Sequence, residues 1–137
     1  MSFDLKFAYS EDGWDPPAPV LQVAIAPAKN DPHLEFSALL DTGADMSVLP
    51  GMVIEALGLV PLRYLNIQAF ENGRKVTRTV AVYVIHLRTP GGLPDGVLEV
   101  VQHEFAPDER YIIIGRDLLN LWRLTLDGPG LRGEISG

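Results

Sequence analysis

The sequence contains no cysteine among its 137 residues. Disulfide bonds, thiol nucleophiles and thiolate metal ligands are therefore excluded. The sequence also lacks an apolar run of membrane-spanning length, and its N-terminal segment carries Asp4, Lys6 and Glu11 where a signal peptide would have an apolar core. From these absences we expect a cytoplasmic protein with no membrane partner.

Positive charge is scarce as well. Eleven Lys and Arg residues stand against eighteen Asp and Glu residues, which gives a formal net charge of −7. A surface with this balance repels the phosphate backbone of nucleic acids, and no cluster of cations reverses it locally. The sequence therefore disfavours a nucleic-acid partner.

Histidine is equally sparse, with His33, His86 and His103 far apart in the chain. None has a partner at a metal-ligand spacing, so we expect surface or strand histidines. Asp41 and Asp45 are close enough to share a Mg²⁺ ion, but their sequence neighbours are apolar, whereas Mg²⁺ prefers oxygen-rich surroundings. The sequence predicts no metal and no cofactor.

What the sequence does contain is typical of a folded, mostly β domain. Apolar residues make up 47 % and charged residues 21 %, and at this length a single domain, 1–137, is the simplest organisation. Thirteen glycines and eleven prolines separate short runs of alternating apolar residues, the pattern of β-strands. The expected strands cover residues 3–9, 20–28, 34–40, 63–70, 74–85, 97–105, 111–114 and 123–128.

Turn and cap residues complete this secondary structure. Residues 50–59 are expected to form a helix, with Pro50 in its first turn and Gly58 as its C-terminal cap. A second short helix is expected after Gly115. Asn72-Gly73 predicts a tight type I′ hairpin turn, because both positions of that turn need positive φ. The last residues, 129–137, are expected either to add an edge strand or to hang loose.

The segment "ALLDTGADMSVLP", Ala38 to Pro50, carries the chemistry. Asp41 directly follows two leucines, so its carboxylate is partly desolvated. Gly43 lets a ligand backbone approach closely, and the Thr42 hydroxyl can hold neighbouring backbone. One carboxylate cannot easily act as acid and base at once, whereas two that share a proton can, since repulsion separates their pKa values. Taken alone, the segment also fits an ordinary turn after a strand.

Two segments together give a family resemblance. "ALLDTGADMSVL" resembles the active-site segment of retroviral proteases and their single-domain, retropepsin-like relatives, whose carboxylate dyad is the standard example of a shared proton. "YIIIGRDLLNLWRLTL" resembles the strand, Arg-containing helix and closing strand of the same family. The likeness covers about residues 20–127, which leaves an N-terminal extension, 1–19, and a C-terminal tail, 128–137. It implies a mostly β, retropepsin-like half-barrel with a β-hairpin flap and one or two short helices.

The resemblance also implies roles for particular residues. Asp41 corresponds to the catalytic aspartate of an aspartic endopeptidase, and Thr42 and Gly43 support the active site. Ala44, Asp45 and Arg116 correspond to substrate-binding positions or to a structural ion pair. The flap corresponds to Phe70, Glu71, Asn72, Gly73 and Arg74. An ordinary surface hairpin is the alternative interpretation of this last segment.

A count of aspartates predicts the assembly. The shared-proton mechanism needs two of them, but the chain has one Asp-Thr-Gly; the nearest internal candidate, Leu126-Asp127-Gly128, lacks the threonine. We therefore expect a homodimer, with a peptide or protein as substrate. Two alternatives stay open: a non-catalytic peptide-binding or dimerisation module with the same fold, and a monomeric acidic β domain. The polar, charged flap tip, Met46 and the tail beyond Asp127 depart from the retroviral pattern.

Overall fold

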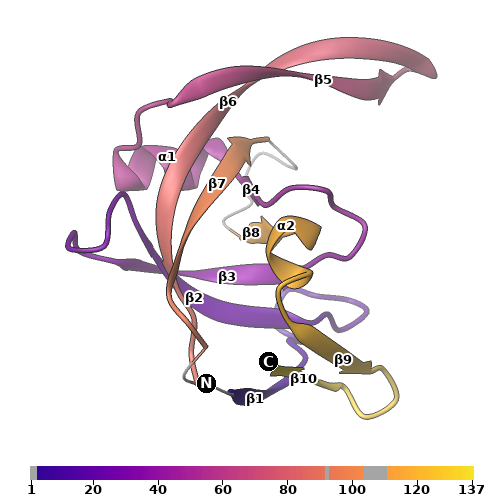
Figure 1. Ribbon diagram of the computed structural model, residues 1–137. Coiled ribbons are helices and arrows are strands. Elements are labelled where there is room, and N and C mark those ends of the chain that lie inside the picture. Colours follow the sequence, from indigo (N-terminus) through magenta and orange to yellow (C-terminus); the bar gives the residue numbers. More distant parts are fainter. Residues whose placement is uncertain (1–2, 92, 104–110) are drawn as a thin grey trace.

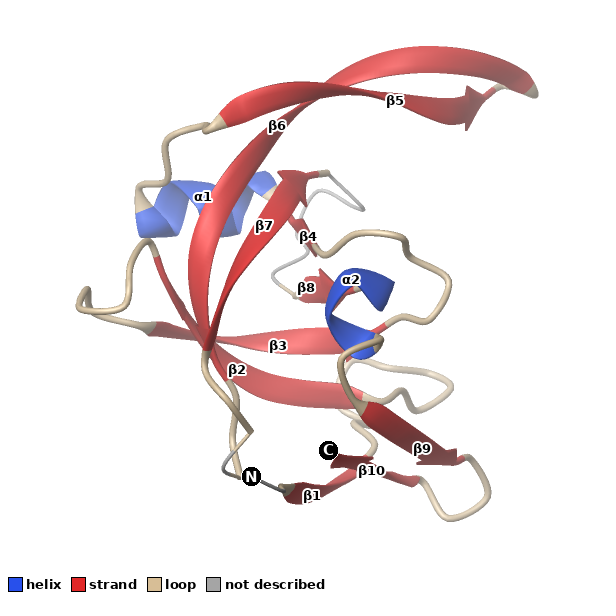
Figure 2. Ribbon diagram, in the orientation of Figure 1, coloured by secondary structure: helices blue, strands red, loops and turns tan. Residues whose placement is uncertain are grey.

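The computed structural model describes residues 3–91, 93–103 and 111–137. Within these ranges the chain forms ten strands and two short helices, and the predicted mostly β character is confirmed (Figures 1 and 2). The strands are β1 (Asp4–Ala8), β2 (Val20–Ala26), β3 (Leu34–Leu40), β4 (Val48–Leu49), β5 (Arg63–Glu71), β6 (Arg74–Arg88), β7 (Gly96–Gln102), β8 (Ile112–Ile114), β9 (Arg123–Asp127) and β10 (Arg132–Ser136). The helices are α1 (Gly51–Leu57) and α2 (Arg116–Leu119). Residues 104 and 105, the end of one expected strand, lie outside the described residues.

The larger sheet has seven strands in the order β2-β3-β8-β4-β7-β6-β5. An additional antiparallel pairing joins β2 to the end of β6, with Ala26 opposite His86, so the sheet curls back on itself. Strand β2 alternates buried and more exposed positions, and its Val23 and Ile25 are almost fully buried. This alternation places one face of the curled sheet in the core.

The smaller sheet has the order β1-β10-β9, and both of its strand pairs are antiparallel. The expectation for residues 129–137 was wrong: β10 is neither an edge strand nor loose, but the central strand of this sheet. Ile135 is fully buried, and a Cβ added to Gly133 would lie 2.4 Å from the Phe7 ring. Because Gly133 has no side chain, the Phe7 ring packs directly on its backbone. This contact helps to hold the N-terminal strand β1 and the C-terminal strand β10 in one sheet.

Helix α1 has the predicted cap at Gly58, but Pro50 lies just before the helix and not in its first turn. Pro50 precedes it in an extended conformation, and Gly58 ends it in the left-handed region with φ 64°. Glycine adopts that conformation without the steric cost that a Cβ carries. Val53 and Ile54 pack its inner face against the core.

Strands β5 and β6 form a long antiparallel hairpin. Its turn residues, Asn72 and Gly73, both have positive φ, 49° and 75°, as the tight turn requires. The hairpin extends beyond the body of the molecule (Figure 1). Neither helix in the described part of the chain has the length and apolar character needed to cross a membrane.

Candidate active site

Two parallel strand ends position the Asp-Thr-Gly loop. Strand β3 pairs in parallel with β8, with Leu40 opposite Ile114. The pairing continues one residue further, because the Asp41 N–H donates to the Ile114 carbonyl at 2.9 Å. Asp41 therefore leaves the sheet in a fixed direction with its side chain half-buried.

The loop folds tightly around the Asp41 carboxylate. The Gly43 N–H donates to Asp41 Oδ1 at 2.9 Å, and the Ala44 N–H donates to the Asp41 carbonyl at 3.2 Å. A Cβ added to Gly43 would lie 3.2 Å from Asp41 Oδ1, which is closer than a side chain normally approaches. Gly43 thus provides both a donor and the space for the carboxylate.

Arg116, the first residue of helix α2 just after β8, holds the loop from the opposite segment. Its guanidinium donates to the Thr42 carbonyl at 2.7 Å and forms an ion pair with Asp45, while its backbone N–H donates to the Ala44 carbonyl at 2.8 Å. The Asp45 side chain is 84 % exposed and that of Arg116 is 42 % exposed. An ion pair this exposed contributes little stability by itself, so its effect is to orient the loop.

Ser47 and Asp117 form a partly buried connection that the sequence analysis did not identify. The Ser47 N–H and hydroxyl donate to the two Asp117 carboxylate oxygens at 2.9 and 2.8 Å. The Ser47 hydroxyl oxygen in turn accepts the Gly115 N–H at 3.1 Å, and Asp117 Oδ1 accepts the Leu118 N–H at 2.9 Å. Ser47 is 2 % exposed. The signal in the sequence is an acid directly after Arg116, but its partner lies 70 residues earlier.

Gly115 allows the two segments to touch through their backbones. A Cβ at this position would lie 2.7 Å from both the carbonyl carbon and the carbonyl oxygen of Met46, and 2.9 Å from the Ala44 carbonyl oxygen. All three atoms belong to the backbone, which cannot yield as a flexible side chain would. The sequence at this point therefore requires glycine for packing.

The predicted flap residues lie at the tip of the β5–β6 hairpin, which ends on the side of the molecule that carries α2 and the loop after β3 (Figure 1). Phe70 is 79 % exposed, and Glu71 forms an ion pair with Arg78. At the base of the hairpin, Arg63 donates to both carboxylate oxygens of Glu99 on β7. The hydrogen bonds from Arg63 lower the pKa of Glu99.

A depression of about 430 Å³ adjoins the Asp-Thr-Gly loop. It is lined by Thr42, Arg116, Leu119, Asn120, Trp122, Leu124 and Leu126. Leu126 is 41 % exposed there. The surface beside Thr42 is therefore largely apolar.

Other acids are engaged elsewhere. Asp127, from the internal Leu-Asp-Gly, accepts the Gly130 N–H at 2.9 Å and lies 3.5 Å from the Arg132 guanidinium, so it belongs to the β9–β10 turn.

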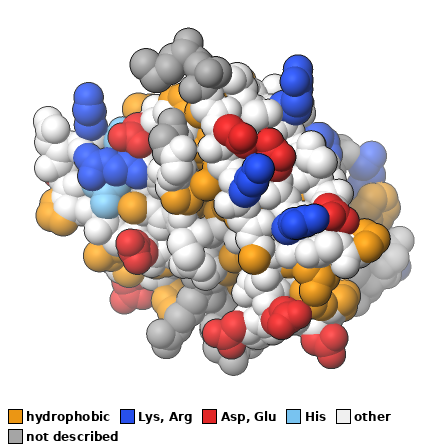
Figure 3. Space-filling model, turned by 90° about the horizontal axis from the view of Figure 1, so that it is seen from below, with side chains coloured by type: hydrophobic (Ala, Val, Ile, Leu, Met, Phe, Trp, Pro, Cys, Tyr) orange, Lys and Arg blue, Asp and Glu red, His pale blue; other side chains and the backbone are white. Residues whose placement is uncertain are grey.

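No three His, Cys, Asp or Glu side chains among the described residues are grouped in a way that could hold a metal ion. On the face shown in Figure 3, acidic and basic side chains are scattered rather than gathered by sign.

Comparisons with known proteins agree with this geometry. A family model described as "Retroviral aspartyl protease" matches residues 16–127. No curated protein matches the chain. Among solved structures, a retropepsin-like aspartic protease from Rickettsia conorii is similar over 99 % of this chain and 92 % of that chain, with 14 % identity and a TM-score of 0.66.

Two further solved structures are similar over smaller shares of the chain. The EIAV protease complexed with the inhibitor HBY-793 has 27 % identity over 75 % of this chain and 86 % of that chain, with a TM-score of 0.44. The retroviral protease-like domain of Ddi1 from Leishmania major has 18 % identity over 80 % of this chain and 82 % of that chain, with a TM-score of 0.46.

The fold is thus retropepsin-like, and the mostly β architecture with two short helices expected from the sequence is confirmed. Because the family model covers most of its length, the chain belongs to the retroviral aspartyl protease family.

Proposed function

We propose that the protein is an aspartic endopeptidase in which Asp41 acts together with Asp41 of a second copy of the chain. The observation that carries this proposal is which carboxylates around the loop already have side-chain partners. Asp45 is paired with Arg116, and Asp117 accepts hydrogen bonds from Ser47. Asp41 receives one backbone hydrogen bond from Gly43 and has no ion pair with a described residue. Asp41 is therefore the carboxylate of this loop that is available to act in catalysis.

The proposed reaction uses two carboxylates that share one proton. Repulsion between them keeps one ionised and the other protonated at the same pH. The ionised carboxylate takes a proton from a water held between the two while the water oxygen attacks the peptide carbonyl carbon, and the protonated carboxyl donates to the carbonyl oxygen. Proton transfer to the leaving nitrogen then breaks the C–N bond.

The neighbouring residues would position this chemistry. Gly43 and Ala44 offer backbone groups beside the carboxylate, and Arg116 keeps the loop in one conformation through Thr42 and Asp45. Thr42 is exposed next to the apolar depression, which makes this surface suitable for the second copy. An extended peptide would lie between the paired loops and the hairpin tip, Phe70 to Arg74, which closes over it.

A non-catalytic peptide-binding or dimerisation module is the second candidate function. The flap tip favours it, because Glu71 and Arg74 are polar and charged where a retroviral flap is glycine-rich and apolar. Such a tip contacts substrate differently. The two candidates differ in turnover, not in fold.

The test compares the wild-type protein with Asp41→Asn, which keeps the side-chain shape but removes the ionisable group. We expect Asp41→Asn to lower peptide cleavage by about 10²–10⁴-fold or more, the usual contribution of acid–base catalysis, while sedimentation shows an unchanged dimer. Asp127→Asn, in the β9–β10 turn, is the matched control and should retain activity. Cleavage unaffected by Asp41→Asn would exclude the proposed activation of water, and a dimer without cleavage in the wild type would favour the binding module.

A further inference from the structure

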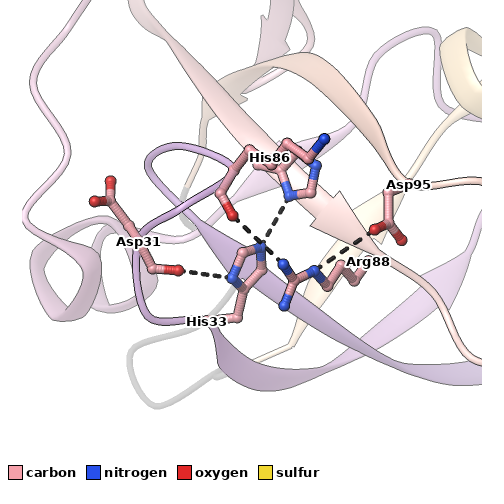
Figure 4. A network of polar contacts seen from close by, with 6 residues as sticks. Asp31, His33, His86, Arg88 and Asp95 are labelled. Carbon is pink, nitrogen blue, oxygen red and sulfur yellow. Dashed lines mark hydrogen bonds and ion pairs between the residues drawn. The ribbon is translucent and has the colours of Figure 1, made fainter.

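Two histidines meet far from the candidate active site. His33 lies just before β3, and His86 lies near the end of β6, 53 residues later. His33 Nε2 is 2.9 Å from His86 Nδ1, and the rings are nearly perpendicular at 86° (Figure 4). His33 Nδ1 is also 2.9 Å from the Asp31 carbonyl oxygen. The pair therefore connects the β2–β3 turn with β6.

His86 is in an enclosed position. It is 4 % exposed, and its neighbours on the two adjacent strands are Ala26 on β2 and Val97 on β7, both apolar. A charge on this imidazole would be poorly solvated. Among the residues that the structure describes, the hydrogen-bond partner found for the His86 ring is His33.

The charged groups around the pair are already engaged or point away. Arg88, two residues further along β6, lies 3.6 Å from Asp95 and donates to the Lys29 carbonyl at 3.4 Å. The carboxylate of Asp31 points away from the imidazoles (Figure 4).

Two more acids lie on the neighbouring strands. Glu35 on β3 is exposed and faces Ala24, one strand away from β6, and Glu99 on β7 is bound by Arg63. No carboxylate of the described chain forms an ion pair with either histidine.

A proton count follows from these contacts. The Asp31 carbonyl can only accept, so His33 Nδ1 carries a hydrogen. When His33 is neutral, its Nε2 accepts and His86 Nδ1 donates. When His33 is protonated, its Nε2 donates and His86 Nδ1 accepts. The contact thus exists with no extra proton or with one. With two, both facing nitrogens carry a hydrogen and the hydrogen bond is lost.

We propose that His33 and His86 form an acid-sensitive latch that holds the β2–β3 turn against β6 and opens when both imidazoles are protonated. The latch lies beside the β2–β6 pairing that closes the curled sheet, where Ala26 is opposite His86. Opening it therefore weakens the closure of the sheet at low pH. This inference concerns folding stability and does not depend on the proposed proteolytic function.

The expected pH dependence has a definite sign. Imidazoles take up protons between about pH 8 and 5. In this range the unfolded chain binds two protons on these residues, whereas the latched chain binds at most one. Since acid favours the state that binds more protons, the unfolding equilibrium constant rises by up to about tenfold for each pH unit of acidification.

The experiment measures denaturant unfolding between pH 8 and pH 5 for the wild-type chain, His86→Gln and His33→Gln. In His86→Gln the glutamine carbonyl accepts from His33 in its charged form, so the folded chain can bind the same proton as the unfolded chain and the tenfold rise per pH unit should disappear, whatever the change in absolute stability. In His33→Gln the buried His86 remains, and because a charge there is poorly solvated, a rise on acidification should persist. His103→Gln, which replaces the histidine outside the pair, should keep the wild-type slope. A wild-type slope in His86→Gln would overturn the proposal.

A spectroscopic measurement on the unaltered chain provides a second test. Nitrogen-detected NMR at pH 8 should find hydrogen on Nδ1 of both His33 and His86. On acidification the two imidazoles should take up their first proton together and the second at lower pH, with loss of the β2–β6 contacts. Independent titration of the two rings, or hydrogen on Nε2 of both at pH 8, would contradict the latch.

Discussion

The Asp41 loop and the β5–β6 hairpin are held by different kinds of interaction. The loop is fixed by buried groups: Ser47 joins Asp117 to the Gly115 N–H, and Gly115 touches the opposing backbone directly. The hairpin is held by strand pairing, including that of β6 with β7, and its side-chain ion pairs are exposed: Arg63 with Glu99 and Arg78 with Glu71. The difference separates a loop held by buried contacts from a hairpin held by exposed ones, which is what the proposed function needs: oriented chemistry beneath a cover that can open.

Gly115→Ala should have the largest effect on this comparison. The new Cβ would overlap the Met46 backbone at 2.7 Å, and because backbone cannot yield, overpacking here should lower the free energy of unfolding by about 3 kcal/mol or more, the upper end of the usual effect. Because the displaced segment carries the loop, activity should fall with stability. Gly96→Ala is the control, since no atom lies within 4 Å of a Cβ there. Equal denaturation midpoints for the two variants would show that the backbone contact is not rigid.

Ser47→Ala should have an intermediate effect. The change removes the hydroxyl that donates to Asp117 and leaves the Gly115 N–H without its acceptor. A buried donor without a partner should lower the free energy of unfolding by about 1–2 kcal/mol, less than the backbone overlap at Gly115. Ser37→Ala, which removes an exposed contact with Gln22, is the matched control and should be nearly neutral. Denaturant unfolding of both variants measures the difference.

The smallest effect is expected at the base of the hairpin. The hydrogen bonds from Arg63 lower the pKa of Glu99 in the folded chain, so this contact stabilises the fold above the ordinary pKa of a glutamate and is lost as pH falls through the lowered value. In Arg63→Gln the pKa of Glu99, followed by NMR titration, should rise toward its ordinary value, while activity at neutral pH stays unchanged. An unaltered Glu99 titration would mean that the two side chains do not pair in solution.

Features that depend on neighbouring residues were predictable from the sequence. The Asn72-Gly73 turn and the cap at Gly58 each follow from backbone preferences of one or two residues, and the observed φ values agree. Eight of the ten strands that the structure describes correspond to expected apolar runs, whereas the short β4 was not expected. The two segments that meet in the candidate site were visible because each has a motif of its own.

Contacts between distant residues were not predictable in this way. Ser47 with Asp117 and His33 with His86 are separated by 70 and 53 residues, and none of these side chains has a local pattern that indicates its partner. The central position of β10 depends on packing against β1, at the opposite end of the chain. The histidines were expected to be surface or strand residues, and this expectation did not include the contact between His33 and His86.

Strand β6 has a mechanical consequence. Over fifteen residues it passes from β5 at the hairpin tip to β7 and finally to β2, and Val82 is paired with both Arg63 and Val101 where the first exchange occurs. A strand of this length spans about 50 Å. The hairpin and the curled sheet are thus connected by one continuous strand, with no loop between them. Movement of the hairpin tip must be taken up by gradual bending along β6. A force applied at the tip therefore reaches the β2–β6 pairing without crossing a loop.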